Sequence, residues 1–275
     1  MTNVNFAIET ITPRKAEELL ARNTRNRNKK PIKIARYARD MAAGNWRLTG
    51  EALKFDGDGT LLDGQNRLYA IIESGASIQT AVARGIAPDA QDVMDTATPR
   101  SGADQLVING HSNGKDLQAA YNAHHGYHSG LLRAANSDLG GTGRLTNAEI
   151  MAYAEKFPEV GDSLVDAVRY KRYFTGFPIG AVALALHEFA KIDADDAYAY
   201  FDRYATMDFT GRGEALKALK RRTDRDAIER RSRYKLGTAL YMLFRTWNAY
   251  RADEPLQKLQ IGSPDKGWAA IPSPR

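Results

Sequence analysis

Residues 61–68 read Leu61-Leu62-Asp63-Gly64-Gln65-Asn66-Arg67-Leu68, and this stretch decides the fold of the first part of the chain. An apolar strand ends there on an acid, turns at a glycine and gives way to a helix. Leu68, Ile71 and Ile72 recur at the spacing of a helix core face, and Gly75 ends the helix. The pattern places Asp63 at the N-cap of this helix.

The start of this helix is predicted to bind phosphate. The first amides of a helix lack carbonyl partners and carry the positive end of the helix dipole, so they attract anions. Arg67, one turn into the helix, would add a bidentate contact. An acid followed by glycine is also common at ordinary helix starts, and capping alone is therefore the alternative interpretation.

A β-hairpin is expected directly before this junction. Residues 52–55 have the composition of a strand, and 56–60 form a tight turn before the strand that ends at Asp63. Together with the strand expected at 78–84, this order of elements resembles the ParB/sulfiredoxin superfamily, in particular its DGQHR-type branch. The resemblance covers about residues 8–100. It departs at Asn66, where the family usually has His, and a carboxamide cannot transfer protons as an imidazole does.

The resemblance implies nucleotide chemistry at this junction. Members of the superfamily bind nucleoside triphosphates or diphosphates, and different branches hydrolyse them, transfer a phosphoryl group or change shape on DNA. For this chain it implies ATP or another nucleoside triphosphate, with Mg²⁺, as the bound ligands. The expected phosphate-binding residues are Gly64 and Arg67, and the expected catalytic residues are Glu51 as general base, Asp63 as Mg²⁺ ligand, and Gln65 and Asn66 to orient a water or an acceptor hydroxyl.

Two basic clusters are candidates for contact with nucleic-acid phosphates. The first lies in a polar loop between two predicted helices, and the second precedes a helix whose apolar face includes Trp247, which we expect in the core. A solvated charged face is the alternative for both clusters, and Asp224 and Asp226 partly neutralise the second. The nucleic-acid-binding candidates are Arg25, Arg27, Lys29, Lys30, Lys33, Arg221, Arg222, Arg230 and Arg231.

The chain changes character near residue 100, beyond which strand patterns nearly vanish. Helical spacing is expected over 116–128, 146–157, 160–170, 179–191, 194–205, 213–222 and 227–250, with a capping box from Thr146 to Glu149. We therefore predict an α+β fold class. A small mixed-sheet ParB/sulfiredoxin-like nucleotide-binding domain occupies 1–100 in this prediction, and an all-α helical domain occupies 101–275.

Composition limits the classes of function. Lys and Arg number 39 against 33 Asp and Glu, and the net charge of +6 favours a polyanionic partner. The chain has no cysteine, which excludes disulfides, thiol nucleophiles and Cys-ligated zinc. No stretch approaches the roughly 18 apolar residues of a membrane span, and the N-terminus lacks a signal-peptide pattern, so we expect a cytoplasmic protein without a membrane partner.

Three of the five histidines, His124, His125 and His128, lie close together in the sequence. The i, i+4 pair His124 and His128 has a spacing that suits a transition-metal ion. No carboxylate completes the set nearby in the sequence, so a polar surface or a DNA-facing site is the favoured interpretation.

The first hypothesis for function is a nucleotide-binding ParB/sulfiredoxin-like protein that acts on or with DNA, by hydrolysis of a nucleoside triphosphate or by phosphoryl transfer. The alternative is a non-catalytic DNA-binding regulator in which the turn at Asp63 is structural. A ParB-like nuclease ranks lower, because the chain lacks a dense set of acids for two metal ions. Nucleotide and DNA are the expected partners, and a homodimer stays open.

Overall fold

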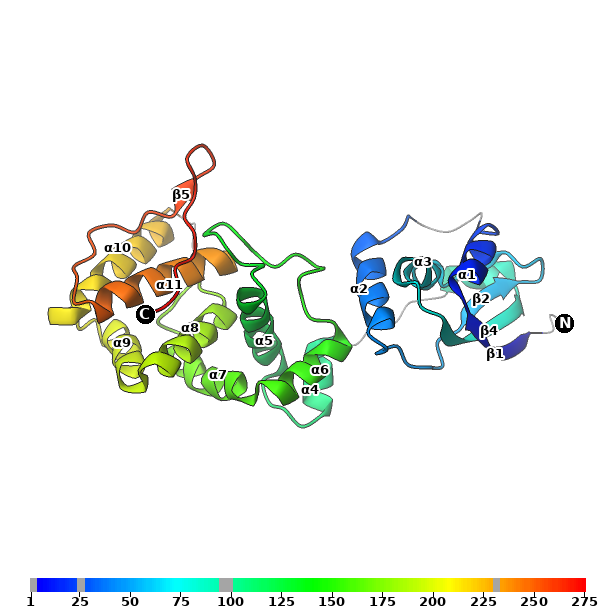
Figure 1. The fold of residues 1–275 in the computed structure, drawn as a ribbon, viewed down its shortest axis with the longest axis horizontal. Helices are drawn as coiled ribbons and strands as arrows, with labels where there is room; N and C mark the ends of the chain where they lie inside the picture. The colour runs from blue at the N-terminus through cyan, green and yellow to red at the C-terminus, as the bar shows by residue number, and fades with distance from the viewer. Residues whose placement is uncertain (1–3, 24–27, 94–100, 230–232) are drawn as a thin grey trace. The chain divides into compact units, whose positions relative to one another are not determined.

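The computed structural model describes residues 4–23, 28–93, 101–229 and 233–275. The chain divides into two compact units, Met1–Pro99 and Arg100–Arg275 (Figure 1). The first unit contains a four-stranded sheet and three α-helices, and the second is almost entirely helical over its described residues. This content confirms the predicted α+β class.

The sheet of the first unit has the strand order β1 (Asn5–Ile11), β4 (Ile78–Ile86), β2 (Leu53–Asp56), β3 (Leu61–Asp63). β2 runs parallel to β4, while β1 pairs antiparallel with β4 and β3 antiparallel with β2. The predicted hairpin is therefore present, and β1 is a strand that the sequence pattern did not predict. Asp56 fixes the hairpin turn, because its Oδ1 accepts the N–H groups of Asp58 at 3.0 Å and Thr60 at 2.7 Å.

The helices of the first unit are α1 (Pro13–Leu20), α2 (Pro31–Ala42) and α3 (Gln65–Ser74), and a 3₁₀ helix follows the sheet at Pro88–Val93. α3 contacts both α1 and α2, and one apolar core joins the three helices to the sheet. α1 begins with Thr12 as N-cap and Pro13 as its first residue: the hydroxyl of Thr12 accepts the N–H of Lys15 at 3.2 Å.

The helices of the second unit are α4 (Gly102–Ile108), α5 (Gly114–His128), α6 (Asn147–Lys156), α7 (Pro158–Tyr170), α8 (Ile179–Ile192), α9 (Ala194–Thr206), α10 (Glu214–Ile228) and α11 (Leu236–Arg251), with a 3₁₀ turn at Gly211–Gly213 and a short hairpin of β5 (Gly262–Ser263) and β6 (Gly267–Trp268). α8 is buried along most of its length and lies at the centre of one large apolar core. Trp247 is fully buried there and stacks on Phe189 with a centroid distance of 4.2 Å, as expected of a core residue. The predicted capping box at Thr146 and Glu149 is present.

The prediction of one helix over 227–250 is wrong. α10 ends at Ile228 and α11 begins only at Leu236. Before α11, the N–H of Tyr234 donates to Gly176 O at 3.0 Å. The ring of Tyr234 packs edge-on against that of Phe177, with a centroid distance of 4.8 Å. These contacts with a distant part of the chain take the place of the local hydrogen bonds that would continue a helix.

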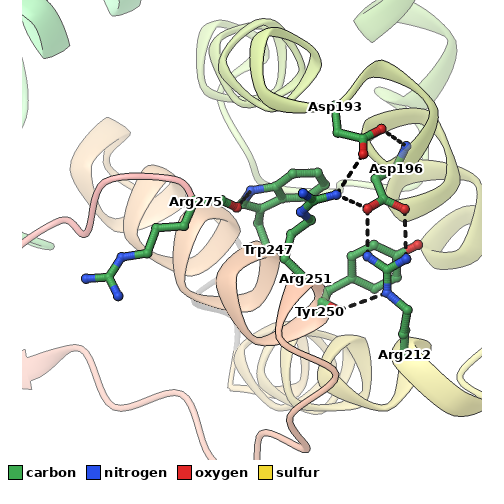
Figure 2. Close-up of polar contacts among 7 residues, drawn as sticks. All are labelled: Asp193, Asp196, Arg212, Trp247, Tyr250, Arg251 and Arg275. Atoms are coloured by element: carbon green, nitrogen blue, oxygen red, sulfur yellow. Dashed lines mark hydrogen bonds and ion pairs between the residues drawn. The ribbon is translucent and has the colours of Figure 1, made fainter.

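A network of charged side chains joins α9 to α11 (Figure 2). Asp196 accepts two hydrogen bonds from Arg212, at 2.8 and 2.7 Å, and a further bond from Arg251. The hydrogen bond from Arg212 is the main reason that the pKa of Asp196 is lowered. In the same region Trp247 Nε1 donates to Arg275 O at 3.0 Å, which attaches the final segment of the chain to α11.

Candidate functional site

The junction between β3 and α3 depends on Gly64. This residue is the N-cap of α3, with φ at 112°, and a Cβ there would lie 2.4 Å from Leu53 Cδ2. Glycine is therefore required both by the backbone conformation and by the close approach of β2. The expectation that Asp63 is the N-cap is wrong: Asp63 is the last residue of β3 and does not cap α3.

The carboxylate of Asp63 lies between two cations instead. Its Oδ2 is 3.2 Å from Arg67 Nη2 and 3.6 Å from Lys54 Nζ. Lys54 is directly opposite Asp63 in the antiparallel pair of β2 and β3, so the register of the hairpin is the signal that could have identified it. A Mg²⁺ ion bound to Asp63 would have to replace these contacts.

The guanidinium of Arg67 is held by the protein. Nη1 donates to Glu51 O and Nη2 donates to Ala52 O, each at 2.7 Å, in addition to the contact with Asp63. Its side chain is only 12% exposed. These contacts fasten α3 to the segment before β2, and a phosphate bound by the same nitrogen atoms would have to displace them. Glu51 is an exposed residue, and its backbone oxygen, not its carboxylate, accepts the hydrogen bond from Arg67.

Gln65 and Asn66 anchor the loop between α1 and α2. Both residues are buried, with 6% and 7% exposure. Asn23 Nδ2 donates to Gln65 Oε1 at 3.2 Å, and Lys30 N donates to Asn66 Oδ1 at the same distance. The two carboxamides, which the sequence predicts to orient a water or hydroxyl, therefore connect the start of α3 to both ends of this basic loop.

The starts of α2 and α3 meet at this point. The N–H of Lys30, the N-cap residue of α2, makes the bond to Asn66 in the first turn of α3. Neither N-cap residue, Lys30 for α2 or Gly64 for α3, caps its helix with a side chain of its own. Two positive helix ends therefore lie together without a capping carboxylate or hydroxyl, which is an arrangement that favours anions.

Lysine side chains surround these helix starts. Lys29 Nζ lies 4.0 Å from the ring centroid of Tyr69 on α3, and Lys33 Nζ lies 5.3 Å from that of Tyr37 on α2. In the part of the chain that the structure describes, no carboxylate forms an ion pair with Lys29, Lys30 or Lys33. The tyrosines are contacts that the sequence did not indicate. Two further candidates, Arg25 and Arg27, lie outside the described residues.

Of the two described candidates in the second basic cluster, Arg222 is paired with an acid and Arg221 is not. Arg222 Nε lies 2.6 Å from Asp226, whose side chain is 3% exposed, and Arg221 Nε donates to Lys217 O at 3.3 Å. Arg222 thus follows the alternative interpretation, in which the acids of α10 neutralise the cluster. Arg230 and Arg231 lie outside the described residues.

Comparison with known proteins gives no relative for this chain: no family model, no curated protein and no solved structure matches it. None of the described helices is both long enough and apolar enough to cross a bilayer.

Proposed function

We propose that the first unit is a ParB/sulfiredoxin-like module that binds DNA without catalysis, through the phosphate backbone, at the paired starts of α2 and α3. One observation carries this proposal: two uncapped helix starts lie together beside Lys29, Lys30 and Lys33, and no described acid neutralises these lysines. Oriented amides and lysines are the groups that bind backbone phosphates.

The contacts of the turn between β3 and α3 favour binding over catalysis. Arg67 donates to two backbone oxygens and to Asp63, and Asp63 is further paired with Lys54. Gln65 and Asn66 hold the loop. Since these residues support one another, the turn serves as a rigid base for the lysines, as in the regulator hypothesis.

Salt dependence tests the proposal. Binding of a short fluorescein-labelled duplex is measured by anisotropy between about 50 and 200 mM salt for the native chain and for the triple variant Lys29→Ala, Lys30→Ala, Lys33→Ala. Because each phosphate contact contributes about 0.9 to the slope of log K against log salt, we expect the slope to fall by about 2 to 3.

The matched control removes three lysines that are paired with acids in the second unit. Lys171, Lys217 and Lys220 pair with Asp116, Glu214 and Asp224, respectively. The same loss of three charges in Lys171→Ala, Lys217→Ala, Lys220→Ala should leave the slope nearly unchanged. An equal decrease in both triple variants, or no DNA binding by the native chain, contradicts the proposal.

A second candidate function is binding of a nucleoside triphosphate such as ATP with Mg²⁺ at the same place, with hydrolysis or phosphoryl transfer. The uncapped start of α3 favours it, since helix starts also bind nucleotide phosphates. Thermal shifts with ATP, CTP, GTP and ADP, with and without Mg²⁺, test this candidate. A Mg²⁺-dependent stabilisation by a triphosphate, weakened in Asp63→Asn and lost in the lysine triple variant, supports it; the absence of any shift leaves DNA binding alone.

A further inference from the structure

A cluster of three imidazoles and one carboxylate lies between α5 and α8. His124, His187 and Glu188 each place one ligand atom within 4.8 Å of the others. His128, one turn after His124 on α5, adds a fourth group, because its Nε2 lies 3.1 Å from Glu188 Oε1. No carboxylate lies near His124 and His128 in the sequence. α8 supplies Glu188, which follows His128 by 60 residues. The lack of a carboxylate nearby in the sequence therefore no longer argues against a metal ion at these histidines.

Three of the four groups, His124, His187 and Glu188, are buried, where polar groups are costly unless they have partners, whereas the side chain of His128 is 41% exposed. His124 and His187 are each 4% exposed, and the side chain of Glu188 is 11% exposed. The cation paired with Glu188 is Lys191, with Nζ 3.4 Å from Oε1, and its own side chain is 55% exposed. The imidazoles are therefore the main buried neighbours of this carboxylate.

The Nδ1 atom of each buried imidazole has a hydrogen-bond partner. His124 Nδ1 lies 2.8 Å from the hydroxyl of Tyr153, and His187 Nδ1 lies 3.1 Å from that of Ser163. Both contacts leave Nε2 as the nitrogen available for a ligand, and that of His187 is 3.9 Å from Glu188 Oε1. Metal-binding histidines in proteins are oriented by such a bond on the opposite nitrogen.

Burial disfavours the charged form of both buried imidazoles. Burial lowers the pKa of His124 to about 3, with His128 and His187 as further causes, and burial also lowers the pKa of His187. Neutral imidazole is the form that coordinates a metal ion.

We propose that His124, His187 and Glu188, with His128 as the fourth ligand, form a site for a divalent transition-metal ion of the zinc class. Three imidazole nitrogens and one carboxylate oxygen are ligands that Zn²⁺ accepts in tetrahedral sites. Four protein ligands fill such a site, so its role is structural: the ion connects α5 to α8. The site lies in the second unit and is independent of the phosphate-binding function proposed for the first.

The experiment uses the full chain without a polyhistidine tag, treated with a chelator and then titrated with Zn²⁺ by calorimetry. We expect one ion per chain, a higher Tm in its presence, and tetrahedral visible absorption bands when Co²⁺ replaces Zn²⁺. Glu188→Gln and His187→Gln should each weaken binding by more than the about 10- to 100-fold that loss of an outer-shell partner costs. Glu155→Gln and His111→Gln alter exposed residues of the same unit and should bind as the native chain does.

Circular dichroism and Tm without metal show whether each variant folds. Should the ligand variants fail to fold, Ser163→Ala decides, because it keeps all four ligands and removes only the partner of His187; it should weaken binding by about 10- to 100-fold. The proposal is overturned if the native chain binds neither Zn²⁺ nor Co²⁺. It is equally overturned if every folded variant among Glu188→Gln, His187→Gln and Ser163→Ala binds as tightly as the native chain.

Discussion

Gly64 shows how a single residue determines the geometry of the candidate phosphate site. Its left-handed backbone lets β3 turn directly into α3, and the absence of a Cβ lets β2 pass close to the turn. Asp63 then remains in the strand, where its neighbours across the hairpin, and not the helix amides, decide its role. A side chain at position 64 would disturb all of these contacts.

The substitution Gly64→Ala is therefore expected to destabilise the first unit by about 2–4 kcal/mol, since it adds backbone strain to a steric clash. Gly75→Ala is the matched control: Gly75 also has a positive φ, 67°, but a Cβ there meets nothing within 4 Å. It should cost only about 1 kcal/mol. Hydrogen exchange of peptides covering β2 and β3 measures the difference, and equal losses in the two variants would contradict this explanation.

At the scale of elements, β1 depends on its pairing with β4. Phe6 and Ile8 are 70% and 64% exposed although they alternate as strand residues do, and only Ile11 is fully buried at the end of the strand. The alternation of Phe6 and Ile8 does not continue to Ile11, which is one position out of step, so the stretch lacks the sustained period of two that predicts a strand. β1 pairs with β4 along its own full length, from Asn5 opposite Arg84 to Ile11 opposite Ile78, and this pairing makes it a strand.

A charged cluster connects β1, β4 and α1 and makes their stability depend on pH. Glu9 accepts hydrogen bonds from Arg84 and from Lys15, the latter at 2.7 Å. The bond from Arg84 is the main cause that lowers the pKa of Glu9 from 4.5 to about 2. Because the folded pKa lies below the unfolded value, this stabilisation is present above pH 4.5 and is lost as the pH falls toward 2.

Glu9→Gln should accordingly destabilise the first unit at pH 7 by about 1–2 kcal/mol after solvent screening. The difference from the native chain should shrink as the pH is lowered through this window. Hydrogen exchange of β1 and β4 peptides at several pH values measures it. Glu17→Gln, at an exposed position of α1, is the control and should change little. A difference for Glu9→Gln that stays constant with pH would show that the ionised carboxylate is not the cause.

At the scale of the whole molecule, the two units differ in the interactions that stabilise each of them. A sheet with three helices forms the core of the first, whereas the second surrounds α8 and adds the network in Figure 2. In that network Asp196 meets both Arg212 and Arg251, and Arg251 also donates to Asp193, the N-cap of α9, at 2.9 Å. Residues distant in sequence are thus connected by one network of hydrogen-bonded charged side chains.

Removal of that shared charge should affect the second unit alone. Asp196→Asn takes the carboxylate from Arg212 and leaves Arg251 with Asp193 alone, and we expect a loss of about 1–3 kcal/mol in that unit. Asp195→Asn, at the adjacent exposed position in the first turn of α9, is the matched control and should cost less than about 0.5 kcal/mol. Hydrogen exchange of α9 and α11 peptides measures this loss of stability, with peptides of the first unit as internal reference. Similar losses in both variants would assign the effect to the helix dipole instead.

The sequence by itself determined the features that depend on near neighbours. The α+β class, the hairpin turn at Asp56, the cap at Thr12 and the capping box at Thr146 follow from residues a few positions apart, whose contacts are set by local backbone geometry. The phosphate-binding prediction for Arg67 and the helix over 227–250 also came from local patterns, and these did not take distant acceptors and packing partners into account.

Only the tertiary structure decided which distant residues meet. It brought the backbone oxygen of Glu51 to Arg67, the N–H of Lys30 to Asn66, and Glu188 to His128. The physical reason is that such contacts arise from the packing of whole elements around a core, and the spacing of residues along the chain carries no record of that packing.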